Sequence, residues 1–219
     1  MIEIEGTKIG SGHRPYIIAE VGINARNDLT LAKRFIEVAA DAGADAVKFQ
    51  THIADAEMVE SEMRSIDAGE VYDTVADCEW SLDEHRELQS HADMHDVTFL
   101  STPFSVEAVD ILDKIGAPAI KIGSGEMNNR ELLKCAADTD RPLLISTGMN
   151  TLDEIEATCD FLDDVASKYA LFYCVSAYPT AATDFDFNTI ETLEEIVDVP
   201  VGFSDHSVGV EAAKAAIGN

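Results

Sequence analysis

The stretch Ala119-Ile-Lys-Ile-Gly-Ser-Gly-Glu126 decides how the rest of the chain is interpreted. Its apolar residues predict a short strand of the kind that is buried in a parallel sheet, and Lys121 interrupts it. A lysine is almost never fully buried without a partner, so we expect an anion close to Lys121. The glycines on either side of Ser124 let the backbone turn sharply and expose N–H groups, which suits phosphate. The stretch therefore predicts a strand end that binds a phosphorylated substrate. A plain strand and tight turn with an incidental lysine is the alternative.

The composition indicates an acidic globular protein. The chain has 219 residues, of which 46% are hydrophobic, and this is enough for one substantial core. Its 42 acidic and 15 basic residues give a net charge of −27. This charge excludes nucleic acid and anionic membrane surfaces as expected partners, because both require a basic face. The acidic residues are scattered rather than gathered in a tail, which predicts a solvated surface of the halophilic type.

The cysteines and the apolar segments predict a cytoplasmic protein. Four cysteines show no Cys-x-x-Cys spacing, which favours free thiols in a reducing compartment. The first residues lack the basic start and long apolar run of a signal peptide. No stretch approaches the ~20 apolar residues that a membrane span requires.

The order of predicted elements favours an α/β fold. Residues 1–14 alternate apolar and polar side chains and predict a short β-hairpin with its turn at Gly6-Thr7. Residues 15–219 alternate strands with helices, which predicts a (β/α)8 TIM-type barrel that is truncated after its seventh strand–helix unit. A doubly wound sheet is the alternative, but the chain carries no Gly-x-Gly-x-x-Gly or P-loop signature to favour it. Residues 51–79 form a long polar connection, which predicts a lid or binding loop. The predicted strands are at 16–21, 46–50, 98–101, 119–122, 142–147, 169–175 and 200–203.

Polar side chains follow each predicted strand. In a βα-barrel these strand ends meet on one face, where active sites form, so we expect a convergent anion-binding site. Any one of these residues alone could be a helix cap or a turn residue, and His206 alone could be structural. The residues are Glu20, Asn24, Lys48, Gln50, Ser101, Thr102, Lys121–Glu126, Thr147, Ser176, Tyr178 and Ser204–His206.

Seven motifs in the same order make the chain resemble the sialic acid synthase family. This family comprises N-acetylneuraminate synthase and its legionaminate, pseudaminate and spore-coat polysaccharide relatives. The resemblance runs from about residue 16 to the end of the chain. The motifs are Ile18–Asn24, Val47–Thr51, Ser101–Phe104, Lys121–Glu126, Ser146–Met149, Tyr178–Thr180 and Gly202–His206.

The resemblance implies an activity, a metal and a set of site residues. The implied reaction condenses phosphoenolpyruvate with an N-acetylated hexose such as N-acetylmannosamine and releases phosphate, with Mn²⁺ polarising the sugar aldehyde. It also implies a homodimer. Lys48 and Lys121 would neutralise phosphoenolpyruvate, Glu20 and Glu126 would activate water or move protons, and His206 would bind the metal. The implied substrate-binding residues are Gln50, Thr102, Ser124, Ser176, Tyr178 and Ser204.

The chain also departs from the family pattern. The loop Asn24–Asn27 lacks the usual histidine and glycine, and Tyr173 stands where a histidine usually precedes Cys174. The sequence stops before the family's second metal-binding histidine and its C-terminal antifreeze-like domain, so we expect weak or no activity from this chain alone. Two alternatives stay open. One is a class I aldolase that forms a Schiff base at Lys121 or Lys48, and the other is a non-catalytic truncated barrel that binds phosphoenolpyruvate.

Overall fold

The structure of the chain, a computed structural model, describes residues 1–166 and 168–218. Asn219, the last residue of the predicted barrel domain, lies outside the described residues. The chain divides into two compact units. The first unit is Tyr16–Lys121, and the second unit combines Met1–Pro15 with Ile122–Asn219.

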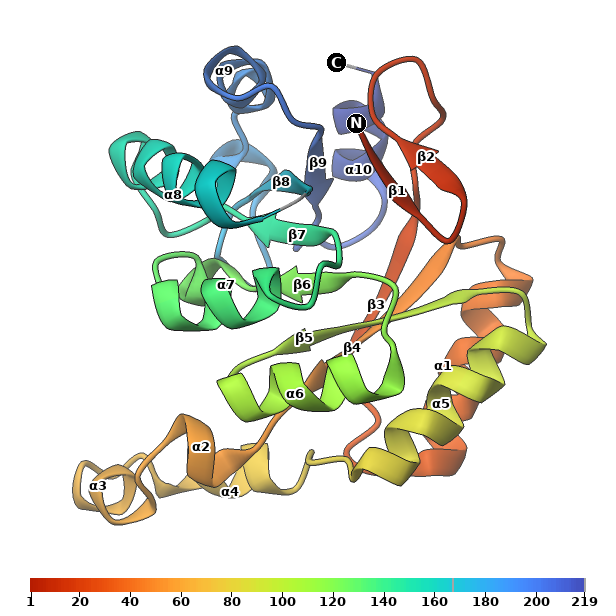
Figure 1. Cartoon of the computed structure of the whole chain (residues 1–219), viewed down its shortest axis with the longest axis vertical. Coiled ribbons are helices and arrows are strands. Elements are labelled where there is room, and N and C mark those ends of the chain that lie inside the picture. The colour runs from red at the N-terminus through yellow and green to blue at the C-terminus, as the bar shows by residue number, and fades with distance from the viewer. Residues whose placement is uncertain (167, 219) are drawn as a thin grey trace. The chain divides into compact units, whose positions relative to one another are not determined.

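The first unit is built from parallel strands with helices between them (Figure 1). The strands β3 (Ile18–Gly22), β4 (Ala46–Thr51), β5 (Thr98–Pro103) and β6 (Ile120–Ile122) lie in chain order, with β6 reaching the division between the units. The connecting helices are α1 (Leu29–Asp41), α5 (Leu82–Met94) and α6 (Val106–Ile115). Each of these helices begins at a residue that the sequence marks as a cap, namely Asp28, Ser81 or Ser105.

One face of β4 and β5 packs against helices, and the other face carries polar side chains. Val47, Phe49 and Phe99 belong to a hydrophobic core that also contains Ile36 of α1 and Leu88 of α5. Successive side chains of a strand point to opposite faces, so the residues between these core positions face away from the helices. Those residues include Lys48, Gln50 and Thr102, and the helix-covered core therefore fixes where these polar side chains project.

The long polar segment after β4 contains three short helices, α2 (Ala54–Glu57), α3 (Glu60–Ser65) and α4 (Gly69–Ala76). None of the three has a side-chain cap, and no residue of α3 or α4 is buried. Charged contacts hold the segment instead. Arg64 binds both Glu60 and Asp73, and the Tyr72 hydroxyl donates to Asp55 at 2.6 Å. These helices are not predicted from the sequence, because they are only four to eight residues long and α3 and α4 bury no residue.

The second unit begins with the predicted hairpin, in which β1 (Ile2–Ile4) pairs with β2 (Thr7–Ile9). The predicted turn position was wrong by one residue. Ile4 pairs with Thr7, so the two turn residues are Glu5 and Gly6, both with positive φ. That conformation matches the twist of a two-residue hairpin turn, and glycine adopts it without a steric penalty.

The rest of the second unit continues the strand–helix alternation. Its strands β7 (Leu143–Ser146), β8 (Tyr169–Cys174) and β9 (Val201–Ser204) are parallel and lie in chain order. Its α-helices are α7 (Arg130–Ala137), α8 (Leu152–Val165), α9 (Asn188–Ile196) and α10 (Glu211–Ile217), and its 3₁₀ turns are η1 (Ser124–Glu126) and η2 (Ala182–Asp184).

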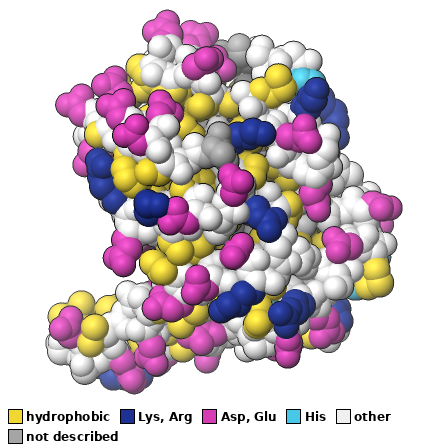
Figure 2. Space-filling model, in the orientation of Figure 1, with side chains coloured by type: hydrophobic (Ala, Val, Ile, Leu, Met, Phe, Trp, Pro, Cys, Tyr) yellow, Lys and Arg dark blue, Asp and Glu magenta, His cyan; other side chains and the backbone are white. Residues whose placement is uncertain are grey.

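The α/β fold class is confirmed. In each unit the parallel strands follow chain order and are connected by helices, which is the arrangement of a TIM-type barrel through its seventh strand–helix unit. An eighth strand of the barrel is not among residues 1–166 and 168–218. No described helix is long and apolar enough to cross a bilayer. Acidic side chains are dispersed over the face drawn in Figure 2, as the composition predicts.

Candidate functional site

Lys48 is the centre of a polar group in the first unit. Its side chain forms an ion pair with Glu20, the residue opposite it on β3, and donates to Thr102 Oγ1 at 3.2 Å. Lys48 is only 8% exposed, whereas the Glu20 side chain is 49% exposed. A buried ammonium with one water-accessible carboxylate can exchange that carboxylate for an anionic ligand. We call Glu20, Lys48, Gln50, Thr102 and Lys121 the lysine group.

Lys121 and Gln50 belong to the same face of the first unit. Ile120 pairs with Ser101, so Lys121 and Thr102 each stand one residue beyond that pair on neighbouring strands. Lys121 is 6% exposed, which confirms the prediction that both lysines are buried. Gln50 Oε1 lies 3.0 Å from His52 Nε2, and Nδ1 of that histidine contacts Glu57 of α2. The segment after β4 therefore orients the end of the Gln50 side chain.

His206 is oriented by two contacts in the second unit. Its Nδ1 lies 2.8 Å from the carbonyl oxygen of Val175, so Nδ1–H donates to this oxygen. Its Nε2 then carries the lone pair and lies 3.4 Å from the hydroxyl of Tyr178, whose ring packs 4.3 Å from the imidazole. A histidine whose Nδ1–H is bound to a carbonyl is the usual form of a metal ligand.

Ser124 lies beside the ends of β7 and β8. Its hydroxyl is 3.2 Å from the sulfur of Cys174. The side-chain amide of Asn150 donates to the carbonyl oxygens of Ser124 and Gly148, at 3.0 and 2.7 Å. Asn150 thus ties the loop after β6 to the loop after β7. Ser124–Glu126 form a 3₁₀ turn, in which the amides of Glu126 and Met127 bond to the carbonyls of Gly123 and Ser124. That the turn at residues 123–125 offers amides to phosphate stays a prediction.

The other predicted site residues of the second unit lie at the ends of β8 and β9 and in η1. Ser204 pairs with Cys174 in register, and Ser176 follows two residues after Cys174 at an exposed position. Glu126 accepts a hydrogen bond from the Asn129 side chain at 2.8 Å. We call Ser124, Glu126, Ser176, Tyr178, Ser204 and His206 the histidine group. Asp205 accepts hydrogen bonds from the amides of Ser207 and Ala213, the second of which lies in the first turn of α10.

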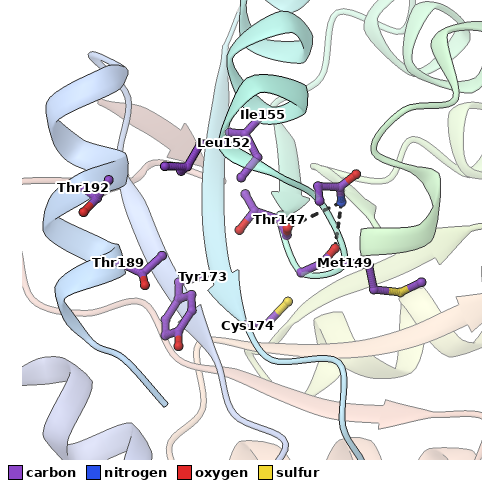
Figure 3. A pocket seen from close by; sticks show the side chains of 10 residues that line it. Thr147, Met149, Leu152, Ile155, Tyr173, Cys174, Thr189 and Thr192 are labelled. Atoms are coloured by element: carbon purple, nitrogen blue, oxygen red, sulfur yellow. Dashed lines mark hydrogen bonds between the residues drawn. The ribbon is translucent and has the colours of Figure 1, made fainter. Parts of the chain in front are cut away.

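A cavity of about 320 Å³ lies in the second unit, at the predicted strand-end residue Thr147 (Figure 3). Thr147 and Met149 line it from the loop after β7, and Tyr173 and Cys174 from the end of β8. Leu152 and Ile155 of α8 and Thr189 and Thr192 of α9 complete its wall, as Figure 3 shows. Its lining adjoins predicted site residues of the same unit, because Cys174 contacts the Ser124 hydroxyl, Asn150 donates to the Ser124 carbonyl and Gly148 packs against Ser176.

Comparison with known proteins identifies the family of the chain that carries these strand-end residues. The NeuB family model matches residues 35–219 of the chain. The chain belongs to the NeuB family. This membership confirms the resemblance that the seven motifs indicate.

Several characterised NeuB relatives are similar to almost the whole chain. The N,N'-diacetyllegionaminic acid synthase of Campylobacter jejuni is 36% identical over 92% of this chain and 63% of its own length. The human N-acetylneuraminate-9-phosphate synthase is 32% identical over 97% of this chain and 61% of its own length. The chain therefore spans a little over three fifths of these relatives.

A solved structure confirms the fold. The N-acetylneuraminic acid synthetase of Leptospira borgpetersenii superposes with a TM-score of 0.90 at 35% identity. The match covers 98% of this chain and 73% of that structure. The agreement extends over nearly all of the strands that carry the lysine and histidine groups.

Sequence reasoning missed three residues that shape these groups. His52 holds Gln50, and Asn150 and Cys174 hold Ser124. Asn150 could have been found, because it is the first polar residue after the Thr147-Gly148-Met149 strand end. The sequence gives no sign that Cys174 contacts Ser124, and His52 lies in a segment without apolar periodicity.

Proposed function

We propose that the chain is the catalytic barrel of a sialic (nonulosonic) acid synthase, which condenses phosphoenolpyruvate with an N-acetylated hexose such as N-acetylmannosamine. The observation that carries this proposal is Lys48, a buried cation at a strand end that is paired with a half-exposed carboxylate. Membership of the NeuB family supports it. The homodimer that the resemblance implies stays a prediction.

The lysine group would bind the anionic end of phosphoenolpyruvate. The ammonium groups of Lys48 and Lys121 would neutralise phosphate and carboxylate, and the Thr102 hydroxyl would donate a hydrogen bond to the same oxygens. The roles of Ser124 and Ser204 as further donors stay predictions from the resemblance. When the phosphate displaces Glu20 from Lys48, this carboxylate becomes available to take a proton. The first amides of a helix have no partner within it, so the Ser124 and Gly125 amides at the start of η1 are further candidate donors.

Carbon–carbon bond formation leaves a positive centre at carbon 2 of phosphoenolpyruvate. Carbon 3 attacks the aldehyde carbon of the sugar, water adds at carbon 2, and the carbon–oxygen bond to phosphate then breaks. Glu20 and Glu126 are the groups that we assign to taking the proton of this water or protonating the new hydroxyl. Gln50, Ser176 and Tyr178 would contact phosphoenolpyruvate or the sugar.

His206 fits the divalent metal, usually Mn²⁺, that the family resemblance implies. Its Nδ1–H is committed to the Val175 carbonyl, so Nε2 is the atom that would bind the ion after the Tyr178 hydroxyl moves away. The bound metal would act as a Lewis acid on the sugar aldehyde. The protein's contribution at this point is to hold the imidazole in one tautomer and one orientation.

The Schiff-base aldolase is less well supported. A lysine attacks a carbonyl only as the neutral amine. Lys48 is already engaged by an ion pair with Glu20 and a hydrogen bond to Thr102. Borohydride trapping with pyruvate separates the two mechanisms, since the synthase reaction forms no imine.

The test is phosphoenolpyruvate binding, measured by isothermal titration calorimetry, for the wild-type chain and the Lys48→Met variant. Phosphate release with Mn²⁺ and N-acetylmannosamine is measured in parallel, also on a form extended through the downstream reading frame. The Lys134→Met variant is the matched control, because Lys134 lies on the exposed surface of α7 and pairs only with Asp138 there. We expect Lys48→Met to weaken binding at least about 30-fold, since a charge pair at ~4 Å near a protein surface contributes several kcal/mol before desolvation.

The outcomes distinguish the remaining alternatives. Binding without phosphate release in either form would favour the non-catalytic barrel. Equal binding by Lys48→Met, Lys134→Met and wild type would contradict the proposed anion site.

A further inference from the structure

Two helices of the first unit bring three metal-binding side chains together outside the predicted site. Glu37 lies on α1, His91 lies on α5, and His95 follows the last turn of α5. Their ligand atoms all lie within 4.8 Å of one another. Among the described residues, this is the group of three His, Cys, Asp or Glu side chains that is close enough to hold a metal ion. The two helices lie side by side in Figure 1 and share the core around Ile36 and Leu88.

The spacing of these residues suits a transition metal. His91 and His95 are four residues apart, which places both rings on one side of a helix, and their centroids are 4.7 Å apart. His91 Nε2 lies 3.4 Å from Glu37 Oε1. Ligand atoms about 2.0–2.2 Å from a tetrahedral zinc ion are separated from each other by roughly 3.4 Å. One ligand pair thus already has the required separation, and the ligand atom of His95 lies within 4.8 Å of both.

The environment of His91 suits a role as a metal ligand better than a simple ion pair with Glu37. Its side chain is 14% exposed, and its Nε2 atom is buried without a hydrogen bond of good geometry among the described residues. A buried polar atom in that state is costly, and such atoms are usually satisfied by an ion or a water molecule. Arg34 donates to Glu37 Oε2 at 2.6 Å, so Oε1 is the oxygen directed to His91. Metal-bound carboxylates commonly have such a second hydrogen bond.

We propose that Glu37, His91 and His95 bind a divalent ion of the zinc type, with water as a fourth ligand. Two imidazoles and a carboxylate are ligands that suit Zn²⁺, whereas Mg²⁺ and Ca²⁺ prefer oxygen. The ion links α1 to α5, the helices that cover the strands carrying Glu20 and Lys48. An ion pair between Lys33 and Glu87 already joins the same two helices. The site differs from the one assigned to His206 in its residues and in its place in the fold.

Zinc binding to metal-stripped protein tests the proposal. The titration uses Zn²⁺ alone, followed by calorimetry, and Co²⁺ as a spectroscopic substitute whose visible absorption reports tetrahedral coordination. The test variants are His91→Gln, His95→Gln and Glu37→Gln. The controls are His13→Gln, which changes an exposed histidine, Glu87→Gln, which breaks the neighbouring ion pair, and His206→Ala, which removes the other candidate metal ligand.

We expect one saturable Zn²⁺ equivalent that survives in all three controls. Loss of an outer-shell partner weakens metal sites 10–100-fold, so removing His91 or His95 itself should weaken binding at least about 100-fold. Zinc at ~100 times its dissociation constant should raise the unfolding temperature of wild type by about 5–10 °C, and of His91→Gln by much less.

The result that would overturn the proposal is Zn²⁺ binding that is weak and unsaturable, or equally tight in wild type, His91→Gln and Glu37→Gln. Such binding would belong to the acidic surface. If His91→Gln does not fold, Glu37→Gln and His95→Gln, which alter less buried groups, decide the outcome through the Co²⁺ spectrum.

Discussion

Replacing Gly148 by alanine should destabilise the second unit, because a methyl group has no space there. A Cβ built at Gly148 would lie 2.7 Å from Ser176 Oγ, 2.8 Å from Cys174 Sγ and 3.1 Å from the Cys174 carbonyl oxygen. Ordinary contacts of a Cβ begin near 3.4 Å. The Ser176 hydroxyl can rotate away, but the carbonyl belongs to the backbone of β8, and Asn150 holds the Gly148 carbonyl at 2.7 Å. The loop after β7 therefore cannot move away without breaking a hydrogen bond.

The magnitude follows from these contacts. Overpacking a well-packed position costs about 1–3 kcal/mol, and a backbone obstacle that cannot rotate places Gly148→Ala at about 2–3 kcal/mol. For a chain of this length that corresponds to a fall of about 4–12 °C in unfolding temperature. Calorimetry or urea unfolding followed by circular dichroism measures the difference.

Gly125→Ala is the matched control, since a Cβ at Gly125 meets nothing within 4 Å. We expect this control to be as stable as wild type or slightly more so, because alanine has less freedom in the unfolded chain. The double variant Gly148→Ala with Ser176→Ala should recover part of the loss, since it removes one obstacle. Equal stability of Gly148→Ala and Gly125→Ala would refute the packing argument.

Three further predictions concern stability. Burial lowers the pKa of His85 from 6.5. The stability that the neutral histidine contributes is therefore present above pH 6.5 and is lost as the pH falls, by up to about 1.4 kcal/mol per pH unit. Urea unfolding between pH 7.5 and 5 should show a smaller loss of stability for His85→Gln than for wild type, and equal slopes would contradict this. Thr151 caps α8: its Oγ1 accepts from the Glu154 N–H, and its own N–H donates to the Glu154 carboxylate. Thr151→Ala should lower the unfolding free energy by about 1 kcal/mol relative to the control Thr183→Ala, which changes an exposed threonine. Molar potassium chloride should raise the unfolding temperature of a chain with a net charge of −27 by screening its self-repulsion, and a melting curve that does not shift would exclude the halophilic surface.

Sequence predicted the parts of the fold that local chemistry determines. The caps at Asp28, Ser81, Ser105 and Thr151 are all confirmed, as is the helix end at Gly116 with its left-handed backbone. These features depend on contacts within a few residues, so the type and spacing of side chains suffice. For the last helix the apolar spacing of the sequence predicts residues 208–217, but the helix begins at Glu211, and its Ala213 amide bonds to Asp205, eight residues away.

Contacts between distant residues could not be predicted in the same way. The chain of hydrogen bonds from Ser101 through Thr51 to His85 joins two strands and a helix, with distances of 2.7 and 2.9 Å. His85 Nδ1 faces the carbonyl of Ser81, so its Nε2 accepts from Thr51. No spacing rule connects residues that are 34 and 50 positions apart. The same applies to Asn150, which acts on Ser124 across 26 positions.

Charge rather than volume identifies the anion site in this chain. The cavity of about 320 Å³ is lined by Thr, Gly, Met, Asn, Leu, Ile, Tyr and Cys, with no Lys, Arg or His among the described residues. Removing a phosphorylated carboxylate from water into such a space would cost several kcal/mol per charge, with no cation to offset it. Lys48 and Lys121 are buried, and the carboxylate beside Lys48 is half exposed and replaceable. The proposed anionic substrate would therefore bind where the chain already maintains buried positive charge, at Lys48 and Lys121.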